Sequence, residues 1–131
     1  MDHLFQTNES RVLFYLDENS RWMKTIRSLA EEIPLLKKML TDKEAAMKDD
    51  YSINEKKYFQ QQLENQQEDI KNLNEEMNEQ EGRLREDAAK HSLYDINALC
   101  SQDILRDRIK EIEKRYIELK YDFMKFLSAI L

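Results

Sequence analysis

The fold is decided by the stretch at residues 105–130, LRDRIKEIEKRYIELKYDFMKFLSAI, in which apolar residues recur alternately four and three positions apart. Residues at that spacing share one face of an α-helix, and a helix with such a seam buries it against other helices. We therefore predict a long helix at about 102–131, packed against helical neighbours. Its seam consists of Leu105, Ile109, Ile112, Tyr116, Leu119, Phe123, Phe126 and Ile130.

A first segment with the same spacing predicts a helix at about 7–48. Pro34 lies inside it, and proline removes a backbone donor and clashes with the preceding turn. Because the seam continues in phase from Ile33 to Leu36, we interpret Pro34 as a kink in one helix. The alternatives are a break near Pro34 or a restart at Thr41, where TDKE has the form of a capping box. This seam consists of Val12, Tyr15, Asn19, Trp22, Ile26, Leu29, Ile33, Leu36 and Leu40, with Met47 beyond it, and the stripe is widened by Leu13, Leu16, Met23 and Met39.

A second segment predicts a helix at about 53–91, opened by the capping-box sequence SINE at residues 52–55. Gly82, in its interior, costs about 1 kcal/mol relative to alanine and could mark a bend or a close approach of helices. A connector at 92–101 is expected to follow, with Ser101 as the cap of the last helix. The second seam is narrow and includes two glutamines; it consists of Phe59, Leu63, Gln66, Ile70, Leu73, Met77, Gln80, Leu84 and His91.

The lengths of these segments and of their connections predict how the helices are arranged. Short connections make neighbouring helices antiparallel. The first two helices should span on the order of 60 Å and the third about 45 Å. We therefore predict an all-α fold: an elongated antiparallel three-helix bundle or coiled coil, with residues 1–131 as a single domain. Residues 41–62 should form a tip that is only two helices thick.

Composition and charge exclude several classes of protein. The chain of 131 residues has one Gly and one Pro, and its net charge of −6 argues against a general nucleic-acid binder. No apolar run approaches the roughly 20 residues that span a bilayer, so no membrane partner is expected. The N-terminal residues lack a signal-peptide pattern, and the lone Cys100 suits a reducing compartment. We expect a cytoplasmic protein.

Two regions of the sequence are candidates for binding another protein. The C-terminal stretch has more apolar residues than one seam needs, which predicts either extra packing inside the bundle or an interface, most simply that of a homodimer. Residues 64–81 hold seven acidic residues and one basic residue, which predicts a solvated helix face or a docking surface for a basic partner. The candidate interface residues are Phe123, Met124, Leu127, Ile130 and Leu131 in the first region and Glu75, Glu76 and Glu79 in the second.

Residues that could carry out chemistry are sparse. Neither histidine has a Glu three positions before it, as the carboxylate–histidine metal sites of helical bundles require, although Asp87 and His91 could share a helical face. A single glycine excludes phosphate-binding loops, and Cys100 has no CxxC partner. We therefore expect no catalytic, cofactor-binding or metal site. The sequence favours a structural or adaptor protein that binds proteins, with self-association as its first mode; the alternative is a regulatory module that uses the acidic face.

Overall fold

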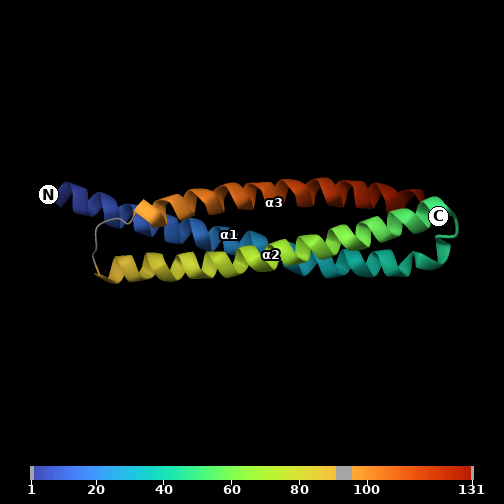
Figure 1. Ribbon diagram of the computed structural model, residues 1–131, viewed down its shortest axis with the longest axis horizontal. Helices are drawn as coiled ribbons and strands as arrows, with labels where there is room; N and C mark the ends of the chain where they lie inside the picture. The colour runs from blue at the N-terminus through green and yellow to red at the C-terminus, as the bar shows by residue number, and fades with distance from the viewer. Residues whose placement is uncertain (1, 91–95, 131) are drawn as a thin grey trace. The chain divides into compact units, whose positions relative to one another are not determined.

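The computed structural model describes residues 2–90 and 96–130, and it describes side chains at 10–86 and 100–130. The described residues form the long helices α1 (Asp2–Asp42), α2 (Asp50–Lys90) and α3 (Ile96–Ala129), with a 3₁₀ turn, η1 (Glu44–Ala46), between α1 and α2 (Figure 1). They contain no strand. The predicted all-α fold of three helices is confirmed, and the seam residues explain it because nearly all of them are buried.

The chain divides into two compact units, each with one segment of every helix. Unit 1 comprises Met1–Ile26 and Asn72–Lys110, and unit 2 comprises Arg27–Lys71 and Glu111–Leu131. In unit 1, α2 and α3 are antiparallel, because Gln80 pairs with Gln102 and Glu76 with Arg108. In unit 2, α1 and α2 are antiparallel, because Lys37 bonds Gln67 and Glu44 bonds Lys56. The division leaves the single-domain prediction untested.

Helix α1 continues through Pro34, so the interpretation of one helix rather than two is correct. Pro34 is exposed, and so is Ala30, the residue whose carbonyl would otherwise accept the missing hydrogen bond. Water can therefore pair that carbonyl, which makes a proline tolerable at this position. Thr41 does not restart the helix, because its hydroxyl donates to the Lys37 carbonyl within the last turn.

The ends of the helices differ from the prediction. Helix α1 ends at Asp42 rather than near 48, because the backbone tightens into η1 and leaves helical geometry at the buried Met47. Helix α2 begins at Asp50, and its cap is Asp49, whose Oδ1 accepts a hydrogen bond from the Ser52 amide at 2.6 Å. That hydrogen bond lowers the pKa of the Asp49 carboxyl. The predicted cap, Ser52, therefore lies in the first turn.

Helix α3 begins at Ile96, inside the predicted connector, because 96–101 contains no Gly or Pro that would stop a helix. The two-helix tip is also shorter than predicted. Phe59, which belongs to the predicted tip, packs on Phe123 and Phe126 of α3, so three helices are present at Phe59. His91, most of the predicted connector and Leu131 lie outside the described residues or side chains.

Two further features differ from the sequence interpretation. Gly82 is exposed, and a Cβ added there would meet nothing within 4 Å, so it marks no close approach of helices. The first stripe is also narrower than expected, because Leu13 and Met39 are exposed while Leu16 and Met23 are half-buried. No helix in the described parts of the chain is both long enough and apolar enough to cross a bilayer.

Candidate interaction surface

The apolar seam of the α3 segment is buried in the interior of unit 2. Every seam residue from Ile112 to Ile130 is buried, and Phe59 of α2 meets two of them, Phe123 at 5.5 Å and Phe126 at 5.2 Å between ring centroids. Leu127, which is not a seam residue, is buried as well. Part of the extra apolar content of the C-terminal stretch therefore packs within the chain.

A second apolar stripe remains on the outer side of α3. Ile117, Tyr121 and Met124 are four and three residues apart, so they share one helical face, and they are 65%, 68% and 39% exposed. Lys120, Lys125 and Ser128 line a shallow groove together with them. We call Ile117, Tyr121 and Met124 the outer stripe; it begins at Ile117, because the position one turn earlier is the exposed Lys114.

Lys120, which lines the groove beside the outer stripe, forms an ion pair with α1. The Lys120 ammonium bonds the Glu32 carboxylate of α1, and this hydrogen bond lowers the pKa of Glu32 by more than partial burial raises it. Tyr116 lies beside the same carboxylate, and burial, together with Glu32, raises the pKa of its hydroxyl. This ion pair holds the Lys120 side chain beside the outer stripe.

The structure separates the apolar candidates predicted from the sequence. Phe123, Leu127 and Ile130 are buried by the chain itself, so a partner cannot reach them while the helices stay packed. Met124 lies on the surface, within the outer stripe. Leu131 lies outside the described residues. Among the four of these candidates that the structure describes, Met124 is therefore the one that an approaching protein can touch.

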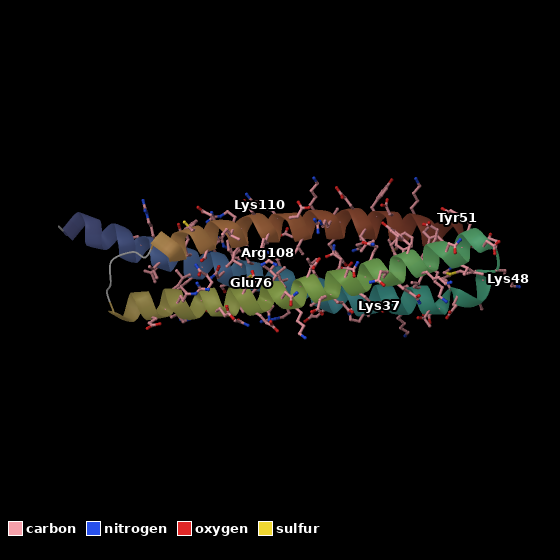
Figure 2. All side chains as sticks on the ribbon, viewed as in Figure 1. Lys37, Lys48, Tyr51, Glu76, Arg108 and Lys110 are labelled. Atoms are coloured by element: carbon pink, nitrogen blue, oxygen red, sulfur yellow. The ribbon has the colours of Figure 1, made fainter. Side chains whose placement is uncertain are left out.

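The acidic candidates on α2 also differ among themselves. Glu75 and Glu79 are exposed and lie one turn apart, whereas Glu76 is paired with Arg108 of α3 (Figure 2). An ion pair within the chain leaves Glu76 less able to attract a basic partner. The interpretation of this face as a docking surface stays a prediction that rests on Glu75 and Glu79.

Unit 1 contains a buried polar layer to which each helix contributes. Asn19, Gln80 and Gln102 occupy seam positions of α1, α2 and α3 and are 0%, 1% and 0% exposed. The Gln102 Nε2 group donates to Asn19 Oδ1 at 3.0 Å, and Gln80 Nε2 donates to Gln102 Oε1 at 3.3 Å. These hydrogen bonds link three amides that would otherwise be costly to bury.

An arginine–glutamate pair closes this layer. Arg106 donates to both carboxylate oxygens of Glu18, at 3.0 and 2.7 Å, and Gln102 Nε2 donates to Glu18 at 2.9 Å. The Arg106 guanidinium also lies 5.8 Å from the centre of the Trp22 ring, at cation–π distance. Trp22, although a seam residue, is half-buried. The Glu18 carboxylate therefore has a structural role, because it already accepts three hydrogen bonds from Arg106 and Gln102.

Groups that could bind metals or act as nucleophiles do not converge in the described parts of the chain. No cluster of three or more His, Cys, Asp or Glu residues with metal-binding geometry occurs there. Cys100 is exposed and free. The side chains of Asp87 and His91 lie outside the described set.

Sequence reasoning missed Ile117 and Tyr121 as surface residues. The signal was present, because Ile117, Tyr121 and Met124 repeat the seam spacing two residues before Leu119, Phe123 and Phe126 of the main seam of α3. It also missed Gln102, which lies one heptad before Ile109 and thus continues the seam as a polar residue. The first signal becomes visible when the apolar residues outside the seam of α3 are examined for the same spacing. The second becomes visible when the seam is extended toward the N-terminus of the helix.

Comparison with known proteins adds no relative. No protein-family model, no curated protein and no solved structure matches the chain.

Proposed function

We propose that this protein is a non-enzymatic helical-bundle adaptor, which binds other protein chains and does so first by associating with a second copy of itself. The observation that carries the proposal is the outer stripe, three large apolar side chains exposed on one face of α3. Single exposed apolar residues are common on proteins, but adjacent ones on one face are typical of contact surfaces.

The packing of unit 2 supports this proposal. Its core already contains the seam residues of its α3 segment, from Ile112 to Ile130, so the outer stripe is not needed to fold this unit. Three exposed apolar residues one turn apart on one helical face reduce solubility unless they are covered. Protein association covers them and gains free energy from the apolar area that leaves water.

Sedimentation velocity from about 10 μM to 1 mM tests the proposal. We expect the wild-type protein to change from monomer to dimer with concentration, and Tyr121→Glu to stay monomeric because a carboxylate would be buried at the contact. The matched control is Leu35→Glu, since Leu35 is 62% exposed on α1 and lies outside the stripe. A wild-type protein that is monomeric throughout, or a Tyr121→Glu variant that dimerises as well as Leu35→Glu, would contradict the proposal.

A further inference from the structure

Charged residues flank the outer stripe in a repeating pattern. Glu118 and Lys125 lie on one side of it, seven residues apart, and both are exposed. Glu113 and Lys120 lie on the other side, also seven apart, and both are half-buried. Each side therefore has an acidic residue nearer the N-terminus of the helix and a basic residue nearer its C-terminus.

These flanks correspond to the e and g positions of a coiled coil whose seam is the outer stripe. In paired helices, residues at these positions choose both the partner and its orientation through interhelical ion pairs. No ion pair involves Glu118 or Lys125 within the described residues of the chain. Both are therefore available to pair with a second molecule.

A parallel pair of α3 helices would bring like charges together. In that arrangement a g residue faces the e residue five positions further along the other helix. Glu113 would face Glu118 of the second copy, and Lys120 would face Lys125 of the second copy. Like-charge contacts at an interface disfavour the arrangement that contains them.

An antiparallel pair brings opposite charges together. With Tyr121 packed against Met124 of the second copy, Glu118 lies opposite Lys125 of the second copy. Two-fold symmetry repeats both contacts, so each interface gains two apolar layers and two ion pairs. No like-charge contact arises between the flanking residues in this register.

From this complementarity we infer that two copies of the chain pair through their outer stripes, with the α3 helices antiparallel and Glu118 of each bonded to Lys125 of the other. The inference rests on the proposed self-association and adds its geometry. The contact covers residues 117–128, about 17 Å of helix. A contact along one helix of that length buries less than the roughly 800 Å² per partner of a standard interface, so we expect a weak dimer with a dissociation constant in the micromolar to millimolar range.

Charge reversal at the flanks tests the orientation in about 50 mM salt, where ion pairs are screened less than at physiological ionic strength. Lys125→Glu and Glu118→Lys, made singly, should each raise the dissociation constant of the dimer by about tenfold, because each creates two like-charge contacts. The double variant Glu118→Lys/Lys125→Glu should restore the wild-type value, since the ion pairs re-form with reversed polarity. Asp122→Lys is the control: it makes the same change of charge as Glu118→Lys at an exposed position outside the flanks, and it should leave the dimer unchanged.

The possible outcomes separate the geometry from the function. In a parallel dimer both single reversals would tighten association, because each converts a like-charge contact into an ion pair, and this result would overturn the inference. A wild-type dimer that is insensitive to both reversals would also overturn it, while the proposed self-association would stand. A wild-type protein that never dimerises would overturn both. Circular dichroism of each variant confirms that the helices are intact.

Discussion

The two units of the chain have interiors of different chemistry. Unit 2 contains an aromatic cluster, in which Phe59 packs against Phe123 and Phe126. Unit 1 contains the amide layer of Asn19, Gln80 and Gln102, together with the Glu18–Arg106 pair. The same seam spacing therefore produces one core with an aromatic cluster and another with an amide layer among buried apolar residues such as Leu73, Met77 and Leu84.

The aromatic cluster and the amide layer are expected to contribute differently, the first to the stability of its unit and the second to the alignment of its helices. Burial of large rings contributes free energy roughly in proportion to area and is non-directional, so by itself it specifies the alignment of the helices less strictly. Linked amides contribute little net free energy, but a slip by one heptad would leave them unpaired among leucines. We therefore expect unit 2 to supply more of the stability and unit 1 to fix the alignment of its three helical segments.

The largest effect is expected from Phe123→Ala in unit 2. Phe123 is fully buried, and truncation of such a phenylalanine removes apolar contacts and leaves a cavity. The free energy of unfolding, measured in urea, should fall by about 3–5 kcal/mol.

Tyr121→Ala is the matched control on the same helix, because Tyr121 is 68% exposed. Measured at a concentration below dimerisation, it should lower the free energy of unfolding by less than about 1 kcal/mol. Equal losses in the two variants would show that the aromatic cluster is not the source of the stability of unit 2.

A smaller effect is expected from Gln102→Leu in unit 1. This change removes the group that donates to Asn19 and Glu18 and accepts from Gln80, so it leaves buried polar atoms without a partner. Each such atom costs about 1–3 kcal/mol, and we expect a net loss near the lower end because leucine adds apolar burial. Urea unfolding measures the loss.

The triple variant Asn19→Leu/Gln80→Leu/Gln102→Leu sharpens this result. With all three amides replaced, no amide of the layer is left unpaired, and stability should return to the wild-type value or exceed it. The three helical segments of unit 1 should then no longer have a single alignment, which should appear as broadened side-chain resonances in NMR spectra. A triple variant that is less stable than Gln102→Leu would mean that the amide layer stabilises the unit outright.

The sequence predicted the buried seams well, because burial in a helical bundle follows directly from spacing. Every seam residue from Phe59 to Leu84 is buried, including Gln66 and Gln80. The spacing of the seam residues does not predict which buried polar residues will hydrogen-bond to one another. Gln80 joins the amide layer, whereas Gln66 Oε1 accepts no hydrogen bond from the described residues, and the difference depends on the residues that other helices place opposite.

The candidate surface was predicted only in part, for a related reason. An excess of apolar residues was evident at the C-terminal end of the last segment, but their number does not separate buried from exposed ones. Leu127 faces the core and Met124 does not, although they are three residues apart. Which of the two residues is buried depends on where the neighbouring helices lie around α3, and the spacing within one helix does not predict this.

The smallest effect concerns the Glu32–Lys120 ion pair of unit 2, which differs from the Glu18–Arg106 pair of unit 1 in being more exposed. The pKa of Glu32 is lowered in the folded state, so the unfolded chain binds a proton at a higher pH than the folded chain does. The stabilisation is therefore present above the unfolded pKa of about 4.3 and is lost as pH falls through the folded value. For a pair this exposed, the stabilisation amounts to a few tenths of a kcal/mol.

Between pH 6 and pH 3 the wild-type protein should lose slightly more stability than Glu32→Gln, as measured by urea unfolding at each pH. Glu31→Gln removes a carboxylate from the adjacent exposed position and should follow the wild-type curve, whereas equal curves for wild type and Glu32→Gln would show that Lys120 does not stabilise unit 2 through Glu32.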